Sequence, residues 1–183
     1  FSPTDGYIVK FNQTLPVLMD KSSILNSVSH STYHSFSEDV IGSLKFFARS
    51  IHGVQDEDTR LTSRLFVPRK RLRGFDTRRV GPRDGTDWVG GNYTAGVGFE
   101  AQLPNLLPDS TRTEVSIFLD TANVWGVDYD GSVDESNSLR SAVGISANVY
   151  TTIGPLSFTL AQDITKETDD VTETFNFRLG TSF

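Results

Sequence analysis

Cysteine is absent from this chain of 183 residues, so it has no disulfide and no thiolate metal site. It also has no apolar run near the ~18 residues that a membrane helix requires, and no segment with helical periodicity and capping residues. These absences exclude a disulfide scaffold and a helical membrane protein. They do not exclude a membrane barrel, because only every second residue of its strands faces lipid.

Residues arranged for catalysis or metal binding are also missing. His30 and His34 lie four residues apart on a predicted strand, a separation of about 13 Å that is too long for sharing one ion. No Ser-His-Asp set and no carboxylate pair has the spacing of a hydrolase. We therefore expect no catalytic residue, no metal site, no cofactor and no enzymatic reaction.

Positive charge is scarce overall but concentrated in one segment. The formal net charge is −6, yet residues 60–83 hold nine Lys or Arg and one acidic residue, Asp76. A nucleic-acid patch, a solvated loop or a plug held among carboxylates would each explain this segment. Nucleic-acid binding is disfavoured, because the basic run lacks interleaved aromatic residues and the rest of the chain is strongly acidic.

The strongest pattern in the sequence has a period of two residues. In residues 91–103, Val97 and Phe99 fall on one face, whereas Glu100 and Gln102 fall on the other. A strand separates two such sets cleanly, and a helix would scatter them. The same pattern predicts eight strands, at residues 6–16, 23–36, 40–52, 91–103, 112–122, 139–151, 155–164 and 171–183.

The first connection, residues 17–22, is short, and from residue 37 onward short and long connections alternate strictly. Short ones at residues 37–39, 104–110 and 152–155 are interleaved with long ones at 54–89, 126–138 and 163–170. Short turns at one end and long loops at the other are typical of an outer-membrane barrel. We therefore predict an all-β, antiparallel transmembrane β-barrel, with a soluble lipocalin-like ligand-binding barrel as the alternative.

The polar faces of the predicted strands favour an interior that admits a bulky group. They carry Gly96, Gly98 and Gly144 with the isolated carboxylates of Glu100 and Asp120; the alternative is that the glycines mark bulges. The longest connection, residues 54–89, is bulky enough to be this group. An eight-stranded barrel, however, has room inside only for its own side chains. The loop therefore lies outside, or the strands belong to a larger barrel. We favour the larger barrel, since the chain starts with phenylalanine rather than methionine and is expected to be a trimmed fragment.

Five motifs, in this order, carry a family resemblance. They are LRGF at 72–75 with VGP at 80–82 and VGGN at 89–92, FLDTANVW at 118–125, LRSAVG at 139–144, IGPLSF at 153–158 and FNFRLGTSF at 175–183. Together they resemble the BamA family of bacterial outer-membrane assembly factors, within the superfamily of outer-membrane assembly and translocation barrels. The resemblance extends from PTDGY at residues 3–7 to the last residue.

The resemblance implies that residues 1–183 are the last eight strands of a 16-stranded barrel in the outer membrane of a Gram-negative bacterium, without the periplasmic domains that precede it. It implies folding and insertion of other β-barrel proteins, with no bond made or broken. The implied partners are outer-membrane lipids, unfolded β-barrel substrates and, through the missing periplasmic domains, accessory assembly lipoproteins. The alternative within the superfamily is a polypeptide-translocating pore of the two-partner secretion type.

The resemblance also implies a lock between the long loop and the barrel wall. In the family this loop folds into the lumen, and its arginine engages wall carboxylates. Carried onto this sequence, the arginine is Arg73 and the carboxylates are Glu100 and Asp120, which the strand pattern places on the polar faces of adjacent strands. Gly74 would allow a close backbone approach, and Phe75 would pack against the wall.

The last predicted strand, residues 171–183, is the second candidate functional feature. Phe175, Phe177, Leu179 and Phe183 lie on one face and suit lipid contact with an interfacial girdle; the alternative is a core-facing strand of a soluble barrel. The resemblance implies that this strand meets the first barrel strand at a weak seam and carries the signal read by the insertion machinery. Isolated, residues 1–183 would expose sheet edges, so we expect them to dimerise edge to edge or to close into a distorted barrel.

Overall fold

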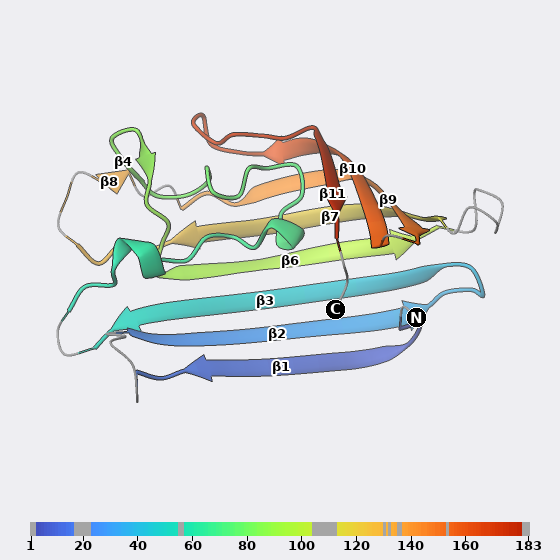
Figure 1. Cartoon of the computed structure of the whole chain (residues 1–183), viewed down its shortest axis with the longest axis horizontal. Coiled ribbons are helices and arrows are strands. Elements are labelled where there is room, and N and C mark those ends of the chain that lie inside the picture. Colours follow the sequence, from blue (N-terminus) through green and yellow to red (C-terminus); the bar gives the residue numbers. More distant parts are fainter. Residues whose placement is uncertain are drawn as a thin grey trace.

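One antiparallel sheet forms the body of the computed structural model, which describes residues 3–16, 23–54, 57–103, 113–129, 131, 133–134, 137–152 and 154–180. The sheet has eight strands in the order β1-β2-β3-β6-β7-β9-β10-β11 (Figure 1). They are β1 (Gly6–Thr14), β2 (Ser23–Ser35), β3 (Ile41–Gly53), β6 (Tyr93–Gln102), β7 (Thr113–Trp125), β9 (Arg140–Thr151), β10 (Gly154–Thr165) and β11 (Phe175–Leu179). The predicted all-β antiparallel fold is confirmed, and the sheet is open: within the described residues, β1 and β11 each pair with one neighbour.

In a soluble protein the apolar face of a sheet is buried and the polar face is exposed. In this sheet the polar face is buried and the apolar face is exposed. The apolar residues Val97 and Phe99 of β6 are 41% and 44% exposed, whereas Thr94 on its other face is 1% exposed. The same alternation leaves outward apolar side chains exposed along the neighbouring strands, at Leu44, Phe46, Ile117, Leu119, Val143 and Ile145. A sheet whose polar face is covered and whose apolar face is open matches strands that meet lipid on the outside.

The strand register places the short turns together at one end of the sheet. Ile41 pairs with Gln102, and Gln102 in turn pairs with Ser116. Thr113 pairs with Val149, close to the tight turn between β9 and β10. The predicted turn at residues 104–110 lies outside the described residues. The longer connections therefore gather at the opposite end, as the alternation of lengths predicts.

The connection between β3 and β6 folds back over the polar face of the sheet (Figure 1). Its described part, residues 57–92, is called the inner loop below. It contains the short 3-10 helices η1 (Leu61–Ser63) and η2 (Arg69–Arg71) and the two-residue strands β4 (Arg83–Asp84) and β5 (Asp87–Trp88). Together with β8 (Val133–Asp134), β4 and β5 form a second, three-stranded sheet in the order β5-β4-β8, which the sequence pattern did not predict.

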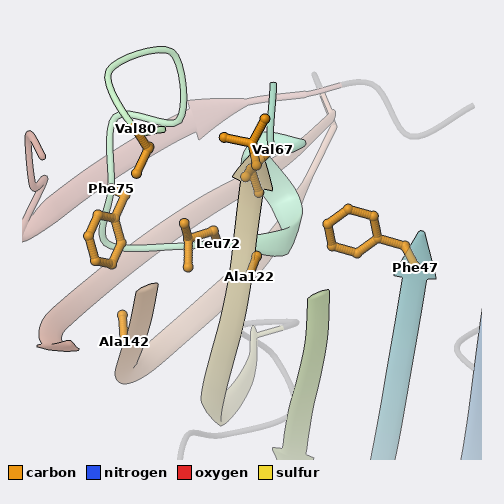
Figure 2. Packing of buried hydrophobic residues seen from close by; sticks show 8 residues of the cluster. Phe47, Val67, Leu72, Phe75, Val80, Ala122 and Ala142 are labelled. Carbon is orange, nitrogen blue, oxygen red and sulfur yellow. The ribbon is translucent and has the colours of Figure 1, made fainter. Parts of the chain in front are cut away.

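The hydrophobic core lies between the inner loop and the sheet. Figure 2 shows Leu72, Phe75 and Val80 of the loop facing Ala122 and Ala142 of the strands. The remaining members of the core cluster are Phe47, Val67 and Val124. Leu72 and Val80 are fully buried, and Phe75 is 1% exposed. Burial of a side chain of this size contributes about 1.5–3 kcal/mol, so apolar packing alone already favours the docked loop.

The last strand is shorter than predicted. It begins at Phe175, so the prediction of a strand from residue 171 is wrong for its first four residues. Residues 171–173 pair with the inner loop instead: Thr172 bridges Phe75, and the amide of Asp76 donates to the Val171 carbonyl at 2.9 Å. The physical reason is that their backbone groups find partners in the loop, whereas the Thr174 carbonyl already accepts from the Ala161 amide of β10 at 2.9 Å. Phe183 lies outside the described residues.

Candidate functional site in the inner loop and the sheet

A bidentate ion pair joins the inner loop to the sheet. Arg73 lies just after η2, and its Nε and Nη2 donate to Oδ2 and Oδ1 of Asp120 at 2.7 and 2.9 Å. Its backbone amide donates to the same Oδ2 at 3.0 Å. The Asp120 side chain, on β7, is only 2% exposed. Charge-assisted pairs of this geometry are about twice as strong as neutral hydrogen bonds, and the fork fixes the orientation of the loop.

Glu100 is a shared and more distant partner. Its Oε2 accepts from Arg73 Nη1 at 3.4 Å and from Lys45 Nζ at 3.1 Å, and its Oε1 accepts from the Ser116 hydroxyl at 2.8 Å. The structure thus brings Arg73, Glu100 and Asp120 together, with Asp120 as the principal partner. Sequence reasoning missed Lys45, although the alternation in β3 puts it between the outward-facing Leu44 and Phe46.

An aromatic ring supports the guanidinium from the wall side. The Cζ of Arg73 lies 3.6 Å from the ring centroid of Phe118, which is 2% exposed. A cation over an aromatic face gains about 0.5–1 kcal/mol when exposed and about 2 kcal/mol when desolvated. Sequence reasoning missed this role. The available signal was an apolar residue on the polar face of its strand, between Ser116 and Asp120.

Gly74 and Phe75 bring the loop backbone against the wall. Gly74 has a φ of +89°, which favours glycine, and an added Cβ would lie 2.9 Å from the Cβ of Ala161 and 3.1 Å from that of Ala142. Phe75 enters the core cluster beside it. The close approach and the packing expected of these two residues are therefore present in the geometry, while their part in function stays a prediction.

Glycines on the polar face of the wall make room for other wall residues rather than for the loop itself. An added Cβ at Gly98 would lie 2.9 Å from Oδ1 of Asp120, and one at Gly144 would lie 2.6 Å from the ring of Phe118. One at Gly96 would lie 2.7 Å from the ring of Phe47. These glycines therefore free the space in which the partners of the loop sit.

Further contacts join the inner loop to the segment that precedes β11. The Arg69 guanidinium donates to both oxygens of Glu173 at 2.9 and 3.1 Å, and the Glu173 amide donates to the Gly74 carbonyl at 2.9 Å. In the same region Asp170 accepts from Nε of Arg140 at 2.8 Å, and both of these side chains are almost fully buried. The loop therefore contacts the approach to the last strand as well as the middle of the sheet.

A third cluster of polar groups lies where the inner loop meets the connection after β7. The carboxylate of Asp128 accepts from the Thr59 amide at 2.8 Å, from the Asn92 side chain at 2.7 Å and from the Arg64 guanidinium. Burial disfavours the ionised carboxyl, but these donors outweigh burial and lower the pKa of Asp128 to about 2. The base of the loop is thereby tied to the neighbouring connection.

The last strand presents its apolar side chains outward. Phe175, Phe177 and Leu179 are 59%, 50% and 60% exposed, and the Phe177 ring lies 5.1 Å from that of Phe158 on β10. The other edge of β11 has no partner strand among the described residues. The strand therefore has one apolar face and one free edge.

Within the described ranges, no group of three or more His, Cys, Asp or Glu side chains is arranged to hold a metal ion. Among those same residues, no helix has both the length and the apolar character for crossing a membrane.

Both the sequence and the fold of this chain resemble those of known proteins. The sequence profile of the Omp85 superfamily domain matches residues 1–183. The outer membrane protein assembly factor BamA of Neorickettsia risticii (strain Illinois) is 28% identical over 188 residues, which cover 100% of this chain and 25% of that protein. The protein of the same name from Neisseria meningitidis serogroup B (strain MC58) is 28% identical over 139 residues, which cover 61% of this chain and 17% of that protein. This chain thus spans a quarter or less of these relatives.

A solved structure has the same fold. The crystal structure of BamA from Haemophilus ducreyi lacking POTRA domains 1–3 matches with a TM-score of 0.82 and 24% sequence identity. The match covers 99% of this chain and 39% of that one. The fold of this chain therefore matches part of a longer chain of known structure.

Proposed function

The chain belongs to the Omp85 superfamily, and from this membership we propose that residues 1–183 are the C-terminal part of an outer-membrane β-barrel that folds and inserts other β-barrel proteins. Both curated relatives described above carry the name of an outer-membrane assembly factor, which supports assembly as the activity. In this proposal the preceding strands and the periplasmic domains lie outside residues 1–183. The membrane is the outer membrane of a Gram-negative bacterium.

The observation that carries the proposal is the docked inner loop. Arg73 reaches the nearly buried Asp120 across the polar face of a sheet whose other face is apolar and open. A soluble ligand-binding barrel would place these two faces the other way round. The ion pair keeps the loop in the lumen and holds the wall in one shape, while the sheet edge at β11 remains available.

The mechanism in this proposal is physical, and no bond is made or broken. When the seam between β11 and the first barrel strand, which lies outside residues 1–183, opens, the edge of β11 exposes backbone donors and acceptors that an unfolded strand can pair with. Local thinning of the bilayer beside this strand is the second effect in the proposal, and both effects lower the barrier to insertion.

The partners follow from the surfaces. Outer-membrane lipids contact the exposed apolar face, and unfolded β-barrel substrates pair at the edge of β11. Accessory assembly lipoproteins bind through periplasmic domains outside residues 1–183. A preparation of residues 1–183 alone is expected to pair its exposed sheet edges and dimerise.

The experiment that tests the proposal uses the complete protein in liposomes. Insertion of an unfolded test barrel is timed with and without the protein, and again with Arg73→Ala and with Arg78→Ala, an exposed arginine of the same loop. We expect acceleration that is lost in Arg73→Ala and kept in Arg78→Ala. No acceleration, together with ion conductance or passage of polypeptide, would replace the proposal with a translocation pore.

A further inference from the structure

A cavity of about 390 Å³ lies between the inner loop and the short-turn end of the sheet. Its charged lining residues are Lys45, Lys70, Arg73 and Arg178 and a single carboxylate, Glu100. The lining is therefore mostly cationic, in a chain whose formal net charge is −6.

The positive charge of the cavity is only partly neutralised. Glu100 is taken by Lys45 and Arg73, and the charge of Arg73 is matched by Asp120. Among the described residues, neither Lys70 nor Arg178 has a carboxylate within ion-pair distance. Two cations therefore line the cavity without an anionic partner.

Arg178 is the more confined of these two cations. It is half-buried on β11, and the positive charges of Arg69 and Arg73 act on it. Arg69 itself is engaged by Glu173. Like charges held together at a partly desolvated site are unfavourable, so an anion placed beside Arg178 would gain more here than on an open surface.

The position of the cavity indicates the source of that anion. Pro155, Ser157 and Gly180 line it, so it is reached from the short-turn end of the sheet, below the inner loop. Arg178 lies on the inner face of β11, whereas the neighbouring Phe177 and Leu179 are exposed on the outer face. The outer face meets lipid, whereas the cavity lies on the inner face, between the inner loop and the short-turn end of the sheet.

We propose that this cavity binds a carboxylate of an incoming unfolded polypeptide, with Arg178 as the principal ligand and Lys70 as the second. The inference rests on the proposed function, because it assumes a strand that pairs with the edge of β11 when the seam with the first barrel strand is open. Residues directly opposite each other on paired strands have Cβ atoms about 4.5–5.5 Å apart. An Asp or Glu at the inward position opposite Arg178 is therefore within reach of its planar fork, which binds carboxylates in a bidentate fashion.

The test measures direct binding to the complete protein in neutral-lipid nanodiscs. The probe is a fluorescent ten-residue peptide of alternating apolar and polar residues with one glutamate at the inward position, paired with a peptide in which glutamine replaces it. At low salt we expect the glutamate peptide to bind about 10-fold more tightly, as for a partly desolvated charge pair. The preference falls to about 1-fold in Arg178→Gln, weakens in Lys70→Gln and is unchanged in Arg78→Gln.

Three results would overturn the inference. Equal binding of the two peptides, or an undiminished preference in Arg178→Gln, removes Arg178 as the ligand. A preference abolished by inorganic phosphate and by anionic lipid in the nanodisc identifies a phosphate site instead. The third result combines two measurements: the wild type shows no preference between the peptides, and Arg178→Gln without peptide melts at a lower temperature than the wild type. Arg178 would then already be bound by another part of the complete protein that fills the cavity.

The insertion assay separates this inference from the proposed function. If the wild type accelerates insertion but does not distinguish the peptides, only the cavity assignment fails. If it distinguishes the peptides but does not accelerate insertion, the cavity assignment stands and the insertase proposal fails.

Discussion

Replacing Asp120 with alanine is the most direct perturbation of the lock. The side chain accepts three hydrogen bonds from Arg73 and is 2% exposed, so its removal leaves a guanidinium and a backbone amide without their main acceptor. The Arg73 side chain is itself 13% exposed and lies over the Phe118 ring. It cannot turn to water without breaking that contact.

The magnitude follows from this geometry. Removing one partner of a buried ion pair costs about 3–5 kcal/mol. We take the lower end, because Glu100 stays within 3.4 Å of Arg73 and recovers part of the interaction. A loss of about 3 kcal/mol corresponds to an opening equilibrium raised about 100-fold. Since Leu72 and Phe75 remain packed in the core, the loop stays mostly docked and opens more often.

Amide hydrogen exchange measures this opening in the complete protein. The amides of Asp76 and Glu173 are suitable reporters, because they donate to Val171 and Gly74 across the contact between the loop and the segment before β11. We expect their exchange to accelerate about 100-fold in Asp120→Ala.

The matched control is Arg79→Ala, in the same loop. The Arg79 side chain is 57% exposed; its Nε lies 3.5 Å from Oδ2 of Asp76, and its Cζ lies 5.9 Å from the ring centroid of Trp88. Loss of such a surface pair costs about 0–1 kcal/mol, so exchange should change less than about 5-fold. An acceleration below 10-fold in Asp120→Ala, or an equal effect of the two variants, would show that the ion pair does not hold the loop.

Three further predictions concern other parts of the loop contact. Gly74→Ala should destabilise docking of the inner loop by about 1–3 kcal/mol, because residue 74 has a positive φ and the added Cβ would clash with Ala161. Adding Ala161→Gly should restore part of this loss, and the rate of proteolysis of the loop measures both variants. If the second substitution gives no rescue, the whole effect comes from backbone strain. Asp170→Ala should lower the free energy of unfolding by about 3–5 kcal/mol, because the buried Arg140 loses this carboxylate. A lower melting temperature would show the loss, and an unchanged melting temperature would contradict it. The folded-state pKa of Asp128 is below its ordinary value of 3.8, so its contribution to stability is complete above about pH 4 and is lost as the pH falls through about 2. Carboxyl NMR should give a midpoint near 2, and a midpoint near 4 would show that these contacts do not hold the carboxylate.

The strand pattern was sufficient for most of the sheet. The predicted strand at residues 139–151 differs by one residue from β9 (Arg140–Thr151), and that at residues 91–103 contains all of β6 (Tyr93–Gln102). Alternation predicts these elements well because each strand has one apolar face toward lipid and one polar face toward the interior. The same alternation failed at residues 171–173, where the pattern continues but the backbone pairs with the inner loop.

The candidate site divides in a similar way. Motif resemblance and strand parity placed Arg73, Glu100 and Asp120 on the right segments and faces. They did not rank the two carboxylates, because the rank depends on how deeply the loop enters and on the competing Lys45. They also missed Phe118, whose contact with the guanidinium exists only after the loop has docked.

The sequence by itself determined the period-two strands and the alternation of short and long connections, because these depend on spacing along the chain, while the family resemblance implied that Arg73 meets Glu100 and Asp120. Only the tertiary structure decided which carboxylate holds Arg73, where β11 begins, and that Lys70 and Arg178 share a cationic cavity. Those outcomes depend on contacts between residues far apart in sequence. Their geometry follows from the strand register and from the path of the inner loop, which local patterns do not encode.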